Sequence, residues 1–532
     1  MKKKSFLTLL LTLILIVSQI PVGVFAQTEE EYAEQEEEER DFEPYPFYIE
    51  TELTEEGYHK LSWSWHGTAR RVKFKIYGAP LGEKYRKIAV VNGPELSFVN
   101  KVLDDKIWKY FVVPVLYLED GTRQKMKPSI KSFLVSKGNT KYTNATSIEI
   151  KGYDYFWLPK GESYKLTLTI TKETEDKKLY SSKKNPKLRY LSSDEGVATV
   201  SDGIVTAVSE GWCYIDVITE NGLDAFVTVQ VEGPVLNPQI DYSFATKEEG
   251  IEYRMSNTEF FNGLTQNDLD YRMQKKGATL EEFIEFSKAQ IRDFTDQEKE
   301  VVDYNMWRLE KDLELKGLTL PEHTSIVFVK TTMEDEPNEY AYTHATQIYL
   351  SEYFLEDAKS FGDDGVDPLY YLYHELFHCL TRNNPEFRRD MYEIINFTVQ
   401  DEEYVIPPSV KEYFYSNPDV EHHNSYATFN INGEDIKCFA AAITTKHFET
   451  EGDNFHWNST TALVPIDGTD IYYLPEDASN FYDVFGYNTD YNIDPEECMA
   501  ENFSMAMYYG VGDLSFFDSP EIIEAIYDYF KK

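Results

Sequence analysis

Residues 374 to 378 read H-E-L-F-H, in a chain with only 10 histidines among its 532 residues. On a helix, His374 and His378 lie one turn apart on the same face, so two imidazoles can reach a single metal ion. Glu375 lies about 100° around the helix from His374, where its carboxylate can contact a water on that metal without binding the metal itself. The spacing therefore predicts a metal site at which Glu375 can contact a metal-bound water. The alternative is a histidine pair on a solvated helix face beside an ordinary exposed glutamate.

The residues around this motif predict the helix that must position it. Asp367 and Pro368 fit an N-cap followed by proline at the first helical position. The helix face opposite the histidines is apolar and consists of Leu369, Leu372, Leu376, Cys379 and Leu380. We therefore expect the helix to be buried by that face and to offer the histidines from the other. Cys379 should then point into the core and not at the metal.

A catalytic zinc needs a third protein ligand, and the segment N-I-D-P-E-E-C-M-A-E at residues 492 to 501 offers one. Asp494 can cap a helix that Pro495 opens, and Glu497 and Glu501 then lie one turn apart on one face. We favour Glu497 as the ligand because a carboxylate then remains at Glu501 to orient a ligand histidine. A Glu497 that merely completes a capping box with Asp494 needs no metal, and Glu496 or Glu501 could then be the ligand.

Both halves of this site resemble the signature of the gluzincins, the thermolysin-like zinc peptidases. The resemblance implies that His374, His378 and Glu497 bind Zn²⁺. It also implies that Glu375 is the general base and that Glu501 orients a ligand histidine. Two features depart from thermolysin: the interval between the two motifs is far longer, and Glu501 stands where thermolysin has an aspartate.

The reaction also needs a donor for the oxyanion and a surface for the substrate. Tyr491 or Tyr487 could supply a phenol, although in a chain with 40 tyrosines either could pack in the ordinary way. The strand predicted at 345–351 could be the sheet edge that holds an extended substrate by β-addition, as in peptidases of this type. His422 and His423 are adjacent in a loop rich in proline, aspartate and asparagine, where we expect both to be exposed.

The chain between this site and residue 240 is predicted to alternate helices with strands. Thr279 with Glu282 and Thr295 with Glu298 form capping boxes before amphipathic runs at 280–291 and 296–313. Apolar runs at 324–332 and 345–354 predict strands. We therefore expect an α+β catalytic domain over 234–532, and the resemblance implies that its fold is zincin-like.

Two all-β sandwiches are expected before this domain. From 47 to 138, alternation such as Val72, Phe74 and Ile76 against charged neighbours predicts a β-sandwich that resembles a fibronectin type III domain. From 139 to 233 the sequence resembles the bacterial immunoglobulin-like group 2 domain, which implies a secreted or cell-surface bacterial protein. The matched residues are Ser192, Ser193, Val197, Ala198, Thr199, Val200, Gly203, Val205, Thr206 and Ala207. A turn is predicted at Asp202-Gly203, and Cys213 is expected to be a buried free thiol.

The N-terminal residues and the composition bear on location and partners. Residues 1–26 carry three lysines, a short apolar run and small residues before Gln27, which predicts a secretory signal peptide. Residues 27–46 are acidic and lack apolar periodicity, which predicts a disordered leader. No stretch is long enough for a transmembrane anchor. A net charge of −41 argues against nucleic acid as a partner, and four cysteines are too few for a disulfide scaffold.

The whole sequence predicts a secreted, extracellular zinc metallopeptidase, cell-surface associated or free, that acts on protein or peptide substrates. Its sandwiches could contact cell wall, glycan or host protein. Two alternatives stay open: a non-peptidase zinc hydrolase, which the same ligands would serve, and a surface adhesin with a degenerate zincin domain. The intact Glu375 argues against the second, because a purely structural zinc has no use for a general base.

Overall fold

The computed structural model describes residues 47–65, 72–118, 122–152, 155–182, 187–337, 339–359, 367–449 and 459–531. The predicted signal peptide and acidic leader lie outside these ranges. The chain divides into two compact units, one that ends at Pro234 and one that begins at Val235. Among the described residues, none of the helices combines the length and the apolar character that spanning a bilayer requires.

The first part of the N-terminal unit is a sandwich of two sheets. One sheet has the order β1 (Glu50–Leu53), β2 (His59–Ser62), β5 (Ser97–Asn100). The other has the order β4 (Arg86–Asn92), β3 (Val72–Pro80), β6 (Ile107–Tyr117), β7 (Arg123–Lys125), with β8 (Ser132–Val135) also paired to β6. Val72, Phe74 and Ile76 are buried, as their alternation predicts, and they share a core with Leu61 of the facing sheet and with Trp63 just after β2.

The second part of this unit is also built from paired sheets. One sheet has the order β11 (Tyr155–Pro159), β19 (Asp224–Glu232), β18 (Gly211–Thr219), β15 (Leu188–Ser192). The others are β12 (Ser163–Lys165), β17 (Ile204–Ala207), β16 (Ala198–Ser201); β10 (Ala145–Ile150) with β13 (Leu168–Lys172); and β9 (Tyr142–Thr143) with β14 (Lys178–Leu179). The predicted Asp202-Gly203 turn joins β16 to β17 with positive φ at both residues, 50° and 77°, as the type I′ turn of a two-residue hairpin requires. Cys213 is buried and free, as predicted.

The turn between β18 and β19 ties the two sandwiches together. Asn221 C=O accepts from Thr51 N–H at 2.7 Å, and Asn221 Nδ2 donates to the carbonyls of Thr51 at 3.2 Å and Ala145 at 3.1 Å. Beside it, Glu220 is 1% exposed, and neither carboxylate oxygen has a hydrogen-bond donor among the described residues. Burial therefore raises the pKa of Glu220 to about 7.

The C-terminal unit begins with a five-stranded mixed sheet. β22 (Ile326–Thr331) runs parallel to β20 (Tyr242–Phe244) and to β24 (Gln347–Ser351), while β21 (Ile291–Arg292) and β23 (Ala341–His344) pair antiparallel with β22 and β24. The expectation that 345–351 is the sheet edge was wrong, because β24 is flanked on both sides and β23 forms the edge. All five residues of β24 are buried, which suits an interior strand.

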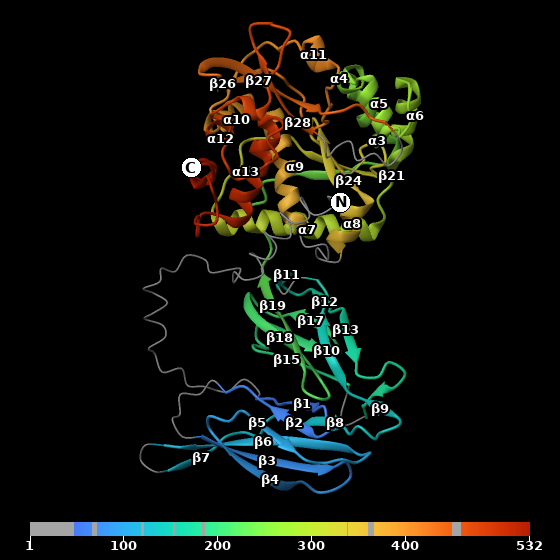
Figure 1. The fold of residues 1–532 in the computed structure, drawn as a ribbon, viewed down its shortest axis with the longest axis vertical. Helices are drawn as coiled ribbons and strands as arrows, with labels where there is room; N and C mark the ends of the chain where they lie inside the picture. Colours follow the sequence, from blue (N-terminus) through green and yellow to red (C-terminus); the bar gives the residue numbers. More distant parts are fainter. Residues whose placement is uncertain are drawn as a thin grey trace. The chain divides into compact units, whose positions relative to one another are not determined.

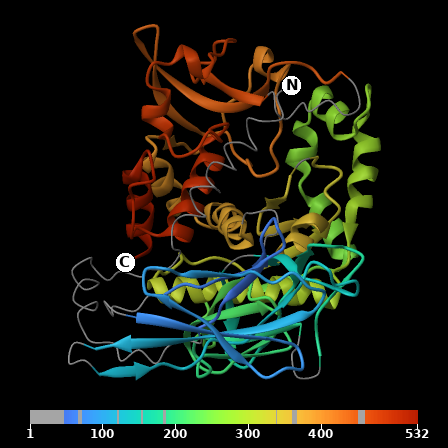
Figure 2. The same cartoon turned by 60° about the horizontal axis from the view of Figure 1, so that its bottom comes forward.

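Helices surround this sheet, and the predicted capping boxes at Thr279 and Thr295 open two of them. The helices are α3 (Lys247–Ser256), α4 (Thr258–Gly263), α5 (Gln266–Arg272), α6 (Leu280–Gln290), α7 (Asp296–Lys316), α8 (Glu352–Lys359), α9 (Pro368–Asn383), α10 (Pro385–Ile394), α11 (Pro408–Lys411), α12 (Phe481–Phe485), α13 (Pro495–Tyr509) and α14 (Pro520–Phe530). In both views, helices α3 to α6 lie on one side of α9, and helix α13 lies on the opposite side of α9 (Figures 1 and 2). One apolar core joins α7, α9, α13 and α14 to the sheet.

A second, antiparallel sheet holds the two segments that approach α9 from outside. Its order is β25 (Thr398–Val399), β26 (Ser425–Ile431), β27 (Glu434–Thr444), β28 (Ser459–Pro465), and the 3₁₀ turn Pro475–Asp477 follows it. Ala442 C=O on β27 accepts from Tyr415 N–H at 3.0 Å, and Thr461 Oγ1 on β28 donates to Asn492 C=O at 2.7 Å. This sheet therefore fixes the chain just before residues 416–421 and just before α13.

Candidate metal centre

Helix α9 carries the H-E-L-F-H motif and begins as predicted. The Asp367 side chain accepts from Leu369 N–H at 3.0 Å, and Pro368 is the first helical residue. The predicted apolar face, Cys379 included, is buried. The opposite face is covered too, because α13 packs across it, and His378 is 0% and Glu375 4% exposed. The solvated-face alternative is therefore wrong.

Helix α13 supplies the carboxylates that meet these histidines. Asp494 caps it by accepting from Glu496 N–H at 2.8 Å, and Pro495 follows as the first residue. The carboxylate of Glu497 contacts the histidines of α9, so it has a partner that a capping role does not explain. Glu496 and Glu497 are both buried, at 5% and 1% exposure.

The three predicted ligands converge on one point. Glu497 Oε2 lies 3.2 Å from His374 Nε2 and 3.8 Å from His378 Nε2. One donor atom from each of these residues lies within 4.8 Å of the others, which is a spacing that can hold a metal ion. His378 Nε2 is buried and has no hydrogen-bond partner within the described ranges. Two imidazoles and a carboxylate are the donor set of many catalytic zinc sites, so the residues fit zinc.

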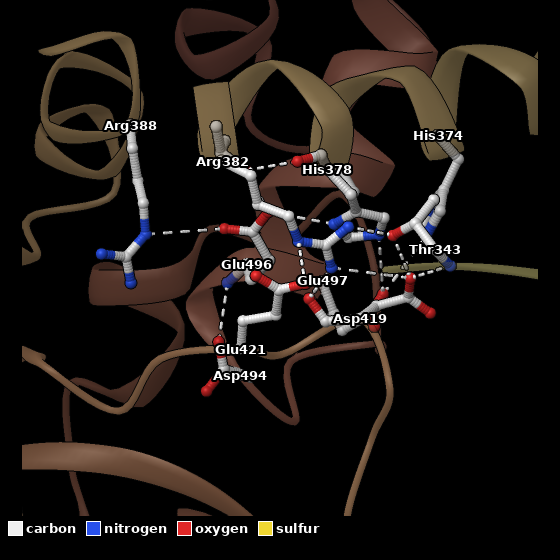
Figure 3. Close-up of polar contacts among 12 residues, drawn as sticks. Thr343, His374, His378, Arg382, Arg388, Asp419, Glu421, Asp494, Glu496 and Glu497 are labelled. Atoms are coloured by element: carbon white, nitrogen blue, oxygen red, sulfur yellow. Dashed lines mark hydrogen bonds and ion pairs between the residues drawn. The ribbon is translucent and has the colours of Figure 1, made fainter. Parts of the chain in front are cut away.

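Each histidine is oriented at Nδ1 by its own carboxylate, and Figure 3 shows the one that meets His378, Glu496. Glu501 Oε1 lies 3.3 Å from His374 Nδ1, and Tyr370 Oη donates to Glu501 Oε2 at 2.9 Å. Glu496 Oε1 lies 3.0 Å from His378 Nδ1. Burial alone would lower the pKa of His374, but its hydrogen bonds to Glu497 and Glu501 raise that pKa well above the usual value. The cluster therefore favours a positive charge at this position, whether from a proton or a metal.

Glu496 has a role that the sequence did not reveal. Thr381 Oγ1 donates to Glu496 Oε1 at 2.6 Å, Tyr392 Oη donates to Oε2 at 2.5 Å, and Arg388 Nε lies 3.8 Å from Oε2. Burial alone would raise the pKa of Glu496, but its hydrogen bond to His378 and these neighbours hold it at about 2. Glu496 and Glu497 lie about 100° apart around α13, so their carboxylates can meet different sides of the histidine pair.

Glu375 lies beside the ligands without joining them. Its Oε2 is buried and has no hydrogen-bond partner in the part of the chain that the structure describes. Burial, and then the charges of Asp419 and Glu497, raise the pKa of Glu375 well above its usual value, although His374 acts in the opposite direction. A carboxyl group with one unpaired oxygen and a raised pKa is suited to proton transfer.

Of the two predicted tyrosines, the structure brings only Tyr491 to the centre. Asn417 Nδ2 donates to Glu497 Oε1 at 2.5 Å and lies 3.5 Å from Tyr491 Oη. Tyr487 is 53% exposed and donates to Asp483 instead, at 3.2 Å. Asn417 was missed from the sequence, where an asparagine in a loop carries no distinguishing signal.

Asn417 belongs to a loop, residues 416–421, that a buried ion network holds from behind. Asp268 accepts from Ser416 N–H at 3.0 Å, and Arg272 donates to Ser416 C=O at 2.6 Å. Arg272 also pairs with Glu336 at 2.8 Å and is 0% exposed. Helix α5 therefore fixes the residue next to the one that contacts Glu497.

The far end of the 416–421 loop meets strand β23. Asp419 Oδ1 accepts from Thr343 N–H at 2.6 Å, and Glu421 Oε1 accepts from Ala345 N–H at 2.7 Å. Arg382, one turn after His378 on α9, donates to Asp419 C=O at 2.7 Å and pairs with Glu421 at 3.1 Å. These contacts join the site helix, the loop and the sheet edge (Figure 3).

The remaining histidine candidates lie apart from the ligands. His422 pairs with Glu403 at 2.7 Å and is exposed, as expected. His423 is largely buried, contrary to expectation, because it packs against Phe414 and Phe439. Burial lowers the pKa of His423 to about 4.

Comparisons with known proteins give little support for any assignment. No family model matches the chain, and no match is found among curated proteins. Among solved structures, the chain is similar to the FN1-FN3 domains of chicken CNTN1, with 13% identity and a TM-score of 0.15 over 38% of this chain and 72% of that one. It is also similar to a C-terminal 282-residue fragment of intimin, solved with the intimin-binding domain of its translocated receptor, with 16% identity and a TM-score of 0.13 over 48% of this chain and 88% of that one. Neither similarity is close enough to carry an argument.

Proposed function

We propose that the C-terminal unit is a zinc-dependent peptidase of the gluzincin type with a zincin-like fold. The observation that supports this most directly is the convergence of His374, His378 and Glu497 around a buried point, with His378 Nε2 unpaired among the described residues. The unpaired Glu375 Oε2 beside them is the second support, since a structural metal site has no use for it.

The division of labour follows from the contacts. Zinc, when bound by His374, His378 and Glu497, supplies a Lewis acid and lowers the pKa of water at the site. Glu375 takes the proton of the attacking water and later gives it to the leaving amine. Tyr491 is the proposed donor to the oxyanion.

The edge strand β23 is the proposed surface for the peptide. Tyr340, just before it, packs against Tyr371 of α9 with ring centroids 4.5 Å apart, and Thr343 contacts Arg382 at the other end of α9. Strand β23 therefore runs alongside the part of the helix that carries the histidines. A peptide added to this edge would lie next to the centre.

We propose in addition that the protein is secreted and that its second sandwich is a bacterial immunoglobulin-like domain. The signal-like residues 1–26 support export, and the matched group 2 motif supports a bacterial immunoglobulin-like module. The second sandwich also exposes Trp212, Tyr214 and Phe226, at 61%, 41% and 53%, as neighbouring rings on one sheet face. An exposed aromatic face of this kind supports a role in contact with cell wall, glycan or protein.

The test uses the full chain. Metal analysis should find one zinc per chain, and a mixed peptide library should be cleaved, with cleavage abolished by a chelator and restored by zinc. A chain that binds zinc and hydrolyses small esters but no peptide would support the non-peptidase hydrolase instead. A chain that takes up no zinc would overturn the proposal.

A further inference from the structure

The edge strand β23 offers a peptide few hydrogen-bonding groups. In an antiparallel strand, alternate residues turn both N–H and C=O to the same side. Tyr340 C=O accepts from Ser351 N–H of β24 at 3.3 Å, so residue 340 faces inward and Ala341 and Thr343 face outward. A peptide that pairs with this edge would use the outward groups of Ala341 first and those of Thr343 next.

This chain already fills the next donors along the edge. Thr343 N–H donates to Asp419, and Ala345 N–H, just beyond the strand, donates to Glu421. Arg382 holds both acidic residues in place, with 2.7 Å to Asp419 C=O and 3.1 Å to Glu421 Oε1. Among the described residues, Ala341 makes no hydrogen bond outside its own sheet. The usable edge therefore ends between Ala341 and Thr343.

The direction in which the peptide pairs with β23 decides which of its ends lies next to the occupied N–H of Thr343. Antiparallel addition is the more common pairing, and it places the N-terminal end of the peptide toward Thr343 and its C-terminal end toward Tyr340. Resting on the peptidase function proposed above, we propose that the enzyme is an N-terminal exopeptidase, which cuts within about two residues of a free amine. The 416–421 loop is the stop that sets this distance.

The group at the stop has the charge that such a substrate needs. Asp419 is 7% exposed, and its Oδ1 accepts from both the N–H and the hydroxyl of Thr343, at 2.6 and 2.5 Å. Its Oδ2 has no hydrogen-bond partner within the described ranges, and Figure 3 shows the carboxylate on the same side of α9 as the two histidines. A peptide ammonium that arrives here would make a charge-assisted hydrogen bond with Asp419.

Three peptides of one core sequence test the inference on the zinc-loaded full chain. One has a free amine, one is N-acetylated, and one is extended at its N-terminus by a ten-residue leader. Mass spectrometry should show stepwise loss from the free amine, at least about 10-fold slower cleavage of the acetylated peptide, and no cut inside the extended core until its leader is removed. Equal cleavage of the first two peptides, or early internal cuts in the third, would overturn the inference and leave the peptidase standing. A zinc-loaded chain that cleaves neither these peptides nor the mixed peptide library would remove both proposals.

A pair of variants tests the recognising group. Asp419→Asn keeps an oxygen for Thr343 but loses the charge, so kcat/KM should fall about 10- to 100-fold more for the free-amine peptide than for the acetylated peptide. Asp401→Asn, an exposed acid in the same region, is the matched control and should behave like the parent. Zinc content of each variant reports folding of the centre. An Asp419→Asn protein that holds zinc and keeps the full preference for the free amine would show that Asp419 does not bind the peptide ammonium.

Discussion

The two histidines of the centre are held at Nδ1 by carboxylates from successive turns of α13, Glu496 and Glu501. An imidazole that donates from Nδ1 has its lone pair on Nε2, so both contacts aim the metal-binding atom inward. The two carboxylates therefore favour, for each histidine, the tautomer whose Nε2 could bind the proposed metal. Removing either carboxylate should affect the metal and not merely the local packing.

Glu375→Gln should separate chemistry from binding. The amide has nearly the same shape but cannot take a proton from water, so kcat should fall at least about 100-fold while zinc stays bound. Peptide turnover and metal content of the same sample check both halves of this prediction. Turnover close to that of the parent would remove Glu375 as the base.

The three acidic residues of α13 should differ in their effect on zinc affinity. Glu497→Ala removes a ligand and should abolish stoichiometric binding. Glu496→Ala and Glu501→Ala each leave one histidine without its orienting carboxylate and should weaken binding by about 10- to 100-fold. Competition with a chromophoric chelator measures all three, with the exposed Glu524→Ala of α14 as control. A Glu496→Ala protein with the zinc affinity of the parent would show that Glu496 does not orient His378 for metal binding.

The sequence predicted the residues of the centre that share a helical spacing and missed those that do not. His374, Glu375 and His378 follow from five consecutive positions, and Glu497 with Glu501 from one helical turn. Asn417 reaches Glu497 from a loop, and no local pattern marks it. Glu496 was considered only as an alternative metal ligand, because one sequence cannot show which histidine a carboxylate on another helix will meet.

At the scale of elements, the candidate centre depends on α5, which acts on it through the 416–421 loop. Arg272 of α5 bridges Asp268, Glu336 and the carbonyl of Ser416, all in the interior. Buried ion pairs add little in themselves, but the loss of one partner strands the other charges away from water. The 416–421 loop should therefore keep its position only while this ion network is intact.

Arg272→Ala should lower the free energy of unfolding of the C-terminal unit by about 3 to 5 kcal/mol, because Glu336 is left buried without this partner. Lys275→Ala is the matched control, since its pair with Glu282 is half exposed and worth at most about 1 kcal/mol. Urea unfolding of both variants measures the difference. Equal losses would show that the network is not needed for stability.

Element boundaries followed from local signals better than sheet order did. The boxes at Thr279 and Thr295 place two helix starts correctly, because capping is settled within four residues. The order of strands around β24 depends on long-range pairing, and the edge was therefore assigned to the wrong segment.

At the scale of the whole molecule, the two units have separate cores, one around Phe74 and one around α9. A shortened chain that begins at Val235 should therefore fold, bind one zinc and keep peptidase activity within about twofold of the full chain. Circular dichroism, metal analysis and peptide cleavage check this. A soluble, zinc-bound fragment without activity would mean that the sandwiches take part in the reaction.

The N-terminal unit should be more stable in mild acid because of Glu220. Its pKa of about 7 in the folded state exceeds the ordinary value of 4.5, so its contribution is full below pH 4.5 and is lost as the pH rises through 7. Relative to Glu220→Gln, the parent should gain about 2 to 3 kcal/mol of unfolding free energy between pH 8 and pH 5. Urea titrations followed by tryptophan fluorescence suit this unit, which holds Trp63, Trp65, Trp108, Trp157 and Trp212. A difference that does not change with pH would contradict the assignment.

The contacts of Asn221 also have a mechanical consequence. This residue binds both the N–H and the C=O of Thr51 on β1, while its own strand pair leads toward Pro234. Tension applied between the two ends of the unit would stretch the Asn221–Thr51 hydrogen bonds and the β1–β2 hydrogen bonds before either hydrophobic core is exposed. The two sandwiches should therefore unfold under force in a single step, and not one after the other.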